Sequence, residues 1–204
     1  MKYTLLFMAF CLFSCGNKET MLLPKSNVTL VKNVSDHSPI YLFFRNTDSD
    51  TLTEVNRKNS IISTNWIFNI DKRLPLRVII PEIIKLQQKK RAEKAHKNEF
   101  AQNYYSYADS IGKNLAFLPF TKVYYKQEKA NSKSILFFGK HHQIWFNKIV
   151  IKKEELQGYL MQLNKVEDPI QIGFDQNLTY EEYIQYKVMM GSFKINENLE
   201  EYIY

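Results

Sequence analysis

The sequence predicts an α+β fold in which helices pack on one face of small mixed sheets. The first observation is composition: 45% of the 204 residues are hydrophobic, 14% are aromatic, and only six are glycine and six proline. Such a chain can bury a core. The second observation is order, because β-branched and aromatic runs alternate with segments of helical period in the second half of the chain. This alternation favours helices laid against a sheet.

The N-terminal half, residues 28–127, begins with predicted strands. Residues 28–31, 40–44 and 61–70 are β-branched and aromatic runs bounded by Asn, Asp, Ser or Pro, which is typical of strands. Pro81 then opens a predicted helix, because proline is tolerated at a first helical position and apolar residues lie around it at helical spacing.

A basic segment and a second helical pattern follow. Residues 85–97 are rich in Lys and Arg with almost no apolar side chains, so we expect them to face solvent as helix or loop. A 3.6-residue period, with Gly112 as its stop, then recurs in Phe100, Tyr104, Tyr107, Ala108 and Ile111. Residues 114–125 are apolar and strand-like, and the polar residues 128–133 mark a boundary between the halves.

The C-terminal half, residues 132–204, opens with a predicted strand and a predicted hairpin. After the strand at 134–138, two apolar triplets flank Asn147 and Lys148, which form a weaker relative of the Asn-Gly turn of tight hairpins. We therefore expect an antiparallel hairpin closed by these two residues.

Two helices and two strands complete this half. Apolar residues at i, i+3, i+4 and i+7 predict a helix over residues 156–163. Thr179, with Glu182 three residues later, is a capping box and predicts the start of a second helix. Strands are expected at 170–174 and 199–204.

The two halves resemble each other at a constant spacing. The matching pairs, each 104 residues apart, are Asp71 with Asp175, Leu74 with Leu178 and Leu76 with Tyr180. Residues 40–44 likewise resemble 135–138, and residues 114–115 resemble 198–199. An internal repeat and a chance similarity between two α+β segments both explain this pattern.

The N-terminus has the shape of an export signal. One positive charge at Lys2 precedes the apolar residues 3–13, and a polar segment begins at Ser14. The apolar run is too short for a membrane-spanning helix, which needs about 20 residues. We therefore predict a signal peptide at residues 1–14.

The four residues Leu12-Phe13-Ser14-Cys15 resemble the lipobox of bacterial lipoproteins. The resemblance implies cleavage before Cys15, attachment of lipid such as palmitate to that residue, and a polar tether over residues 15–27. Cys11 is a poorer candidate because it follows Phe10, which is not small. Removal of the signal leaves one cysteine and no disulfide within a molecule. An ordinary cleaved signal with a chance cysteine at its end is the alternative.

Residues 135–204 resemble the periplasmic domain of the ExbD/TolR biopolymer-transport family. The matching parts are the hairpin at 144–147, the helix start at 154–156 and the strand and turn at 172–180. Lys148 and Glu181 occupy places where the family usually has glycine. Together with the spacing of the halves, the resemblance implies one or two related ExbD/TolR-like units.

ExbD and TolR proteins also carry a membrane helix with a proton-linked Asp ahead of this domain, and no such segment is recognised in this sequence. The resemblance therefore implies a periplasmic dimerisation or ligand-contact module and not a proton-conducting subunit. Its partners would be an energised transport complex or peptidoglycan, and a homodimer stays open.

No catalytic, metal or cofactor site is predicted, and we expect a non-enzymatic protein. Asp36, His37 and Ser38 have the residue types of a hydrolase triad, but neighbours in sequence cannot face one another as a triad requires. His141 and His142 would point to opposite faces of a strand and have no further ligand nearby, so we expect a surface turn.

Four residues are candidates for binding. Asp71 and Asp175 each follow a strand and precede a helix, where an Asx turn is the structural alternative. Tyr180 belongs to the matching sets of the two halves. Trp145, with Trp66 and the many tyrosines, could form a surface on which sugars stack, and packing in the core or on a sheet is the alternative.

Two functions follow from these observations. The first is a lipid-anchored, non-enzymatic module whose body faces the periplasm, preferably from the outer membrane, and which contacts protein or peptidoglycan. The second is a lipoprotein that binds a small molecule or glycan in a cleft between its halves. A flat apolar or basic face would support the first, and a deep pocket lined by Trp or Tyr the second.

Charge narrows the choice of partners. The formal net charge of +7 would make nucleic acid a candidate in the cytoplasm, but export excludes it. Acidic envelope polymers and anionic lipid surfaces stay as partners, with the charge of an ordinary solvated surface as the alternative.

Overall fold

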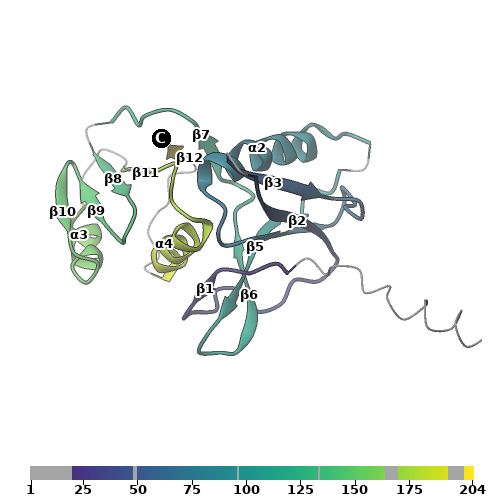
Figure 1. Ribbon diagram of the computed structural model, residues 1–204, viewed down its shortest axis with the longest axis horizontal. Helices are drawn as coiled ribbons and strands as arrows, with labels where there is room; N and C mark the ends of the chain where they lie inside the picture. Colours follow the sequence, from purple (N-terminus) through teal and green to yellow (C-terminus); the bar gives the residue numbers. More distant parts are fainter. Residues whose placement is uncertain (1–19, 48–49, 96, 133, 164–169, 193–199) are drawn as a thin grey trace, which may run out of the picture.

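The structure, a computed structural model, describes residues 20–47, 50–95, 97–132, 134–163, 170–192 and 200–204. These residues form two mixed sheets and three helices, so the predicted α+β class is confirmed. Figure 1 shows the N-terminal sheet on the right and the C-terminal sheet on the left, with α4 (Tyr180–Ser192) between them. Among the described residues no helix is long and apolar enough to cross a membrane.

Six strands form the N-terminal sheet, in the order β1-β5-β4-β2-β3 with β6 paired to β5. They are β1 (Lys25–Ser26), β2 (His37–Asn46), β3 (Thr51–Asn56), β4 (Asn65–Ile70), β5 (Asn103–Asp109) and β6 (Asn114–Pro119). Strands β2, β4 and β5 run parallel, whereas β2–β3 and β5–β6 are antiparallel hairpins. The strands predicted at 40–44 and 61–70 are present, although the second begins only at Asn65.

The C-terminal sheet has the order β10-β9-β8-β11-β12-β7. Its strands are β7 (Tyr124–Lys126), β8 (Ile135–Phe138), β9 (Ile144–Phe146), β10 (Ile149–Ile151), β11 (Gln171–Phe174) and β12 (Glu200–Ile203). The strands β8, β11, β12 and β7 are parallel, and β8, β9 and β10 form an antiparallel meander. Every strand predicted for this half is present to within a residue or two.

The helices are α2 (Leu76–Ala92), α3 (Leu156–Leu163) and α4. Helices α3 and α4 lie where the sequence predicts them. The capping box of α4 is formed, because the amide of Glu182 donates to Oγ1 of Thr179 at 3.3 Å and the amide of Thr179 donates to Oε2 of Glu182 at 3.0 Å.

Helix α2 begins five residues before Pro81, so the predicted start was wrong. Leu76, Ile79, Ile80 and Ile83 are all fully buried, and their spacing of i, i+3, i+4 and i+7 already contains the helix. Pro81 lies inside it, where it cannot donate a hydrogen bond to the carbonyl of Arg77 and its ring crowds that carbonyl. Burial of the apolar face of α2 outweighs this local cost.

The predicted helix over residues 100–111 was wrong, because β5 and the β5–β6 turn occupy this segment. The buried residues Asn103, Tyr105, Tyr107 and Asp109 alternate along β5, as a strand requires. Phe100 and Ile111, which would have belonged to the apolar face of a helix, are 88% and 73% exposed. Pairing with β4 and β6 on both sides decides the conformation.

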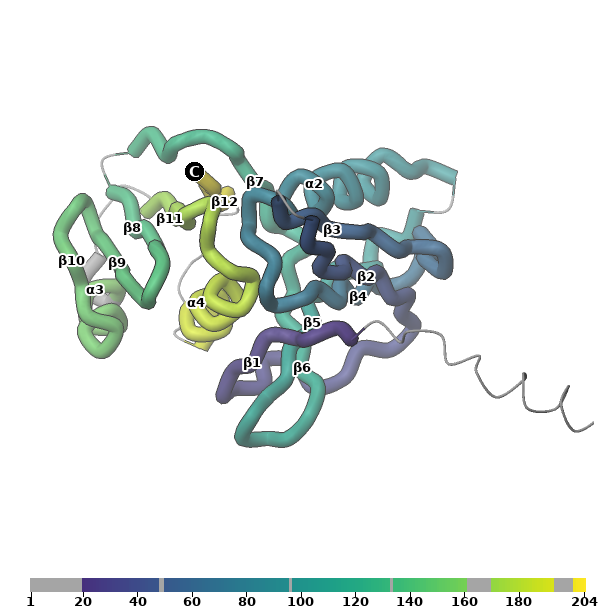
Figure 2. Tube along the Cα trace, in the orientation of Figure 1, coloured from purple at the N-terminus to yellow at the C-terminus, as the bar shows by residue number. Residues whose placement is uncertain are grey.

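The N-terminal segment also differs from the prediction. Residues 28–31 form no strand, apart from one bridge between Val31 and Phe117. The segment is held instead by the hydroxyl of Tyr107, which donates to the carbonyl of Val28 at 2.8 Å and accepts from the amide of Leu30 at 3.0 Å. The tether expected to reach residue 27 ends earlier, because β1 pairs with β5 (Figure 2).

The basic segment 85–97 is not wholly solvent-facing. Leu86, Gln87 and Lys90 are buried against the sheet, with Lys90 only 9% exposed. An ammonium this deeply placed needs hydrogen-bond acceptors around it, and a composition count cannot reveal them.

The two halves are related by symmetric hydrogen bonds. The amide of Leu76 donates to the carbonyl of Leu178 at 2.9 Å, and the amide of Tyr180, its counterpart 104 residues later, donates to the carbonyl of Leu74 at 2.8 Å. A second such pair joins the same two turns. The amide of Arg77 donates to the carbonyl of Gln176, and the amide of Glu181 donates to the carbonyl of Lys72. The units β2-β3-β4-α2-β5 and β8-β9-β11-α4-β12 thus meet about a local pseudo-twofold axis.

One part of the expected repeat was wrong. Strand β12 pairs parallel with β11 as β5 does with β4, so β12 is the counterpart of β5 and not of residues 114–115 in β6. Residues 198–199 lie outside the described residues. Strand β7, expected in the N-terminal half, adds to the C-terminal sheet beside β12.

The junction of the two units is a buried cluster of tyrosines. The hydroxyls of Tyr105 and Tyr125 are 2.6 Å apart, and those of Tyr125 and Tyr183 are 3.2 Å apart. Tyr183 donates to Oε2 of Glu201 at 2.8 Å. Because every member is buried, this network joins β5, β7, α4 and β12 into one core.

Candidate functional site

Asp71 has a structural role at the turn between β4 and α2. It is 1% exposed, and both its oxygens accept hydrogen bonds from the Arg73 guanidinium at 2.8 Å. Burial alone would raise the pKa of Asp71, but the Arg73 side chain and the amides of Arg73 and Leu22 outweigh it and hold the pKa below its ordinary value. The carboxylate is therefore fully engaged within the fold.

Asp175 occupies the equivalent turn after β11. Its Oδ1 accepts a hydrogen bond from the amide of Asn177 at 2.8 Å, which is the Asx turn considered from the sequence. Tyr180 is fully buried beside Tyr105 and Tyr183, so it cannot contact a ligand from solvent. The structure therefore does not bring these residues together with Trp145.

Trp145 lies on the face of the C-terminal sheet that points away from the core. Its ring is 5.8 Å from the ring of Phe137, which in turn is 5.0 Å from the ring of Tyr204. All three side chains are only half-buried. Trp145 is thus part of a partly exposed aromatic group and not of the core.

The strand register explains why these rings meet. One row across the sheet pairs Val150 with Trp145, Trp145 with Phe137, Phe137 with Gly173 and Gly173 with Tyr202. Side chains of one row point to the same face, and their neighbours along each strand point to the opposite face. In β8 those neighbours, Leu136 and Phe138, are buried in the core.

These residues line an open pocket of about 650 Å³, which we call the aromatic pocket. It is lined by Ser132, Ile135, Phe137, Trp145, Asn147, Lys148 and Tyr204. The floor is aromatic and aliphatic, while a hydroxyl, an amide and an ammonium stand at the rim. This combination is typical of small-molecule sites, in which apolar walls give contact area and a few polar groups orient the ligand.

Two glycines make room for the aromatic rings. A Cβ on Gly173 would lie 2.9 Å from Cδ2 of Phe137 and 3.2 Å from the hydroxyl of Tyr204. A Cβ on Gly139 would lie 2.3 Å from Cζ3 of Trp145. The rings of Phe137 and Tyr204 therefore pack directly on the backbone of β11. The ring of Trp145 packs on the backbone of Gly139, the residue that follows β8.

The rim is set by the β9–β10 turn, which closes the predicted hairpin. Asn147 and Lys148 have φ values of 48° and 71°, as a type I′ turn requires of both central residues. The side-chain Oδ1 of Asn147 accepts a hydrogen bond from the backbone amide of Ile135 at 2.9 Å. The backbone amide of Asn147 donates to the carbonyl of Ile135 at 3.0 Å. The backbone of Lys148 thus has a fixed place beside the pocket, in a conformation that favours glycine.

Sequence reasoning found Trp145 but missed Phe137, Tyr204 and Lys148. Alternation in β8 could have placed Phe137 on the face opposite to Leu136 and Phe138. The position of Tyr204 could not be deduced, because it depends on the parallel pairing of β11 with β12. The tyrosine cluster fills the centre of the junction between the halves. At its edge an open pocket of about 340 Å³ lies between residues 25–28 and the C-terminal half, but no Trp or Tyr among the described residues lines it.

Other candidates from the sequence are surface features. His141 and His142 lie in the β8–β9 turn with φ values of 57° and 59°, as the surface-turn prediction required. The described residues contain no group of three or more His, Cys, Asp or Glu that could hold a metal ion. Cys15 and the signal peptide at residues 1–14 lie outside the described residues.

Comparisons with models of protein families, with curated proteins and with solved structures found no match to this chain. The pocket geometry and the sequence therefore carry the functional argument.

Proposed function

We propose that the protein is a lipid-anchored, non-enzymatic binding module of the cell envelope, and that it binds a glycan in the aromatic pocket. The observation that carries the proposal is the row of half-exposed rings, Trp145, Phe137 and Tyr204, on the outer face of the C-terminal sheet. A soluble surface rarely leaves several aromatic rings together unless they contact a partner.

A sugar ring suits both parts of the pocket. Its C–H face is apolar and can stack on the indole of Trp145, while its hydroxyls can bond to polar groups around the edge. Ser132, Asn147 and Lys148 supply such groups at the rim. A purely apolar ligand would leave the ammonium of Lys148 without a role, so a ligand with both polar and apolar faces fits better.

The expected export signal and the acyl chain on Cys15 would place this pocket in the envelope. Peptidoglycan is then the glycan we favour, because its peptide carboxylates could also pair with Lys148. The body of the protein would face the periplasm, preferably from the outer membrane.

Co-sedimentation with purified peptidoglycan sacculi tests this proposal. We expect the full-length protein to sediment with sacculi and Trp145→Ala to lose at least roughly fivefold in affinity, taking the about 1–3 kcal/mol that one aromatic ring contributes when a nucleobase stacks on it as the scale. Ile111→Ala is the matched control, because Ile111 is exposed in the β5–β6 turn far from the pocket in sequence and sheet. Equal binding by wild type and Trp145→Ala would refute the role of the pocket.

A second candidate function is contact with an ExbD/TolR-type transport complex. The observation in its favour is the pseudo-twofold pairing of two units at residues 72–77 and 176–181. A single chain with two ExbD/TolR-like units, each with helices on one sheet face, would offer a covalent version of a homodimer. Pulldown of the full-length protein from detergent-solubilised envelopes, with Cys15→Ala as the comparison, tests this candidate. Loss of transport subunits from the Cys15→Ala sample would support it, whereas their absence from both samples would contradict it.

A further inference from the structure

A second pocket, of about 310 Å³, lies at the C-terminal end of α2. We call it the α2 pocket. Its charged lining residues are Lys90, Arg91, Lys97, Lys122 and Glu99. Four cations and one carboxylate give this pocket a formal charge of +3, within a chain whose total is +7. A concave site with this balance concentrates anions from solution.

Lys90 supplies a buried charge at the base of the α2 pocket. Its ammonium donates to the carbonyl oxygens of Thr64 at 2.9 Å and Gln102 at 3.3 Å, and to Oδ1 of Asn103 at 3.0 Å. These three acceptors are neutral, and the ring of Trp66 lies 4.8 Å away. Because neutral dipoles satisfy its donors, the positive field of Lys90 is not cancelled by them and extends into the pocket.

Arg91 is held in place beside it. Its Nη2 donates to the carbonyls of Thr121 at 2.9 Å and Val123 at 3.1 Å, and its guanidinium lies 4.1 Å from the centre of the Tyr124 ring. The hydrogen bonds within the described part of the chain use only Nη2 of this group. A guanidinium that is already oriented, with further N–H donors, is suited to the oxygens of a phosphate group.

The other two cations come from different segments. Lys122 is an exposed residue between β6 and β7. Lys97 pairs with Glu99 at 2.7 Å, but their side chains are 45% and 73% exposed, and such a pair contributes little. An incoming dianion could therefore recruit Lys97 at small cost.

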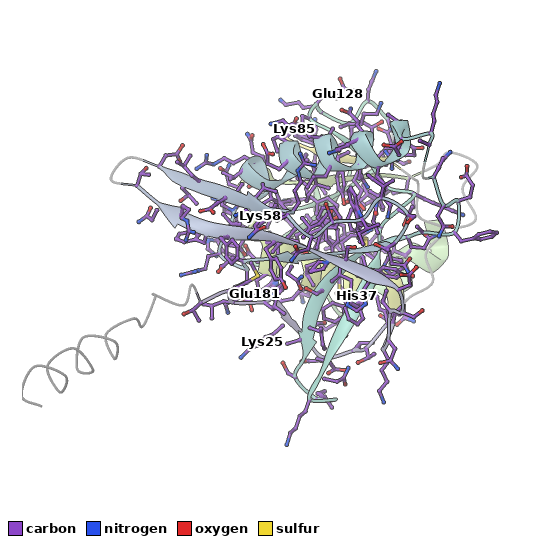
Figure 3. The ribbon with its side chains drawn as sticks, turned by 90° about the vertical axis from the view of Figure 1, so that its right-hand side faces the viewer. Lys25, His37, Lys58, Lys85, Glu128 and Glu181 are labelled. Carbon is purple, nitrogen blue, oxygen red and sulfur yellow. The ribbon has the colours of Figure 1, made fainter. Side chains whose placement is uncertain are left out.

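Stabilisation of the helix end is the structural alternative. Lys89, Lys90 and Arg91 lie in the last turn of α2, where cations favour the helix dipole. This explanation does not cover Lys97 and Lys122, which lie outside the helix and line the same pocket. Positive charge also continues on the other side of α2, where Lys89 lines a pocket with Arg57 and Lys58. In Figure 3, Lys58 and Lys85 lie on the same side of the molecule as α2, opposite to Lys25.

We propose that the α2 pocket binds a phosphate group, either as a free phosphate compound or as part of an anionic polymer or lipid headgroup. Arg91, Lys97 and Lys122 would contact its oxygens, and Lys90 would add to the attraction without direct contact. This site is separate from the aromatic pocket, because the two share no lining residue.

Equilibrium dialysis of the full-length protein in neutral detergent against radiolabelled inorganic phosphate tests this proposal. We expect saturable binding at low ionic strength. The double variant Lys97→Gln with Lys122→Gln should weaken it roughly tenfold, since two charge-assisted contacts are lost. Both residues are exposed, so this variant should fold normally. Arg91→Gln, which also removes the bonds to Thr121 and Val123, should weaken it further.

The matched control is Lys113→Gln with Lys140→Gln, which removes the same charge from exposed turns outside the α2 pocket. Absence of saturable binding, or equal weakening by both double variants, would overturn the proposal. Competition for the bound radiolabelled phosphate separates the two sources. Displacement by a phosphodiester such as glycerophosphoglycerol identifies a polymer or lipid headgroup as the ligand. Displacement by glycerol 3-phosphate alone identifies a free phosphate compound. Trp145→Ala should leave phosphate binding unchanged, so failure of this site is distinguishable from failure of the glycan site.

Discussion

Lys187 of α4 and Glu201 of β12 form an ion pair in which Nζ and Oε1 are 2.7 Å apart and the side chains are 2% and 1% exposed. The second oxygen of Glu201 accepts a hydrogen bond from Tyr183, which connects through Tyr125 to Tyr105 of the other sheet. This pair is thus the charged end of the network that joins the two units.

Removing one partner of this pair should be strongly destabilising. Lys187→Met leaves the buried carboxylate of Glu201 without its ion-pair partner, and Glu201→Leu takes away the carboxylate that lies 2.7 Å from the buried ammonium of Lys187. We expect the Lys187→Met change to cost about 3–5 kcal/mol in the free energy of unfolding, and Glu201→Leu to be destabilising as well. The double variant should recover much of that loss, because no charge then stays buried. Urea unfolding measures all three proteins. Losses that simply add in the double variant would show that the two groups do not act as a pair.

The pH dependence of stability should report Lys90. Burial lowers the pKa of Lys90 from 10.5 to about 8. Between these values the unfolded chain binds more protons than the folded chain, so the Lys90 contribution to stability rises as pH increases from about 8 to 10, by at most roughly 3 kcal/mol. Below about pH 8 Lys90 is protonated in both the folded and the unfolded chain, so the full cost of burying its charge lowers the stability of the folded chain.

Lys90→Met should remove this rise. Buried tyrosines such as Tyr105 and Tyr183, whose pKa burial raises well above the ordinary value, lower stability at the alkaline end in both proteins. The difference between wild type and Lys90→Met, measured by urea unfolding at several pH values, is therefore the quantity to compare. Two parallel curves would mean that Lys90 does not titrate in this range.

Lys148→Gly should stabilise the protein and weaken its binding of glycan. Lys148 has a φ of 71°, in the left-handed region where a side chain costs about 1 kcal/mol relative to glycine, so thermal unfolding should shift upward. Loss of the rim ammonium should lower affinity for sacculi. Lys113→Gly is the matched control, because Lys113 has a φ of 50° in the β5–β6 turn and lies outside the pocket. It should stabilise equally and leave binding unchanged, and a similar loss of binding in both variants would contradict the role of Lys148.

Gly173→Ala should deform the aromatic pocket. The added Cβ would meet the rings of Phe137 and Tyr204 and force at least one to move, at a cost of about 1–3 kcal/mol in stability. Affinity for glycan should fall with it. Gly158→Ala in α3 is the comparison, because a Cβ there meets nothing within 4 Å and should stabilise the helix by up to about 1 kcal/mol. Unchanged binding by Gly173→Ala would argue against stacking in the pocket.

Features encoded within a few residues could be predicted from the sequence. The Asn147-Lys148 turn and the capping box of Thr179 and Glu182 each depend on local backbone chemistry, and both are present. The segment around Tyr105 could not be assigned in this way, because its aromatic residues satisfy a helical period and a strand alternation equally. Long-range pairing with β4 and β6 settles that choice.

The same distinction applies to the candidate site. Asp71 and Asp175 were correctly located at equivalent turns, but Arg73 engages both oxygens of Asp71, and the amide of Asn177 bonds to Oδ1 of Asp175. Trp145 became part of a pocket only through the register that sets Phe137 and Gly173 beside it. Residues brought together by parallel strands leave no spacing in the sequence that identifies them.

The early attachment of the N-terminal segment limits how far the protein can reach. The amide of Leu22 donates to Asp71 at 3.2 Å, and the amide of Lys72 donates to the carbonyl of Leu22 at 2.8 Å, so the chain is fixed to the body from Leu22 onward. Seven residue steps separate Cys15 from Leu22, which is at most about 25 Å even when fully stretched. If Cys15 carries the lipid as we propose, this short segment keeps the folded body close to the membrane surface. Both pockets would then sample only a thin layer above their own bilayer, and any polymer they hold would be drawn against that membrane.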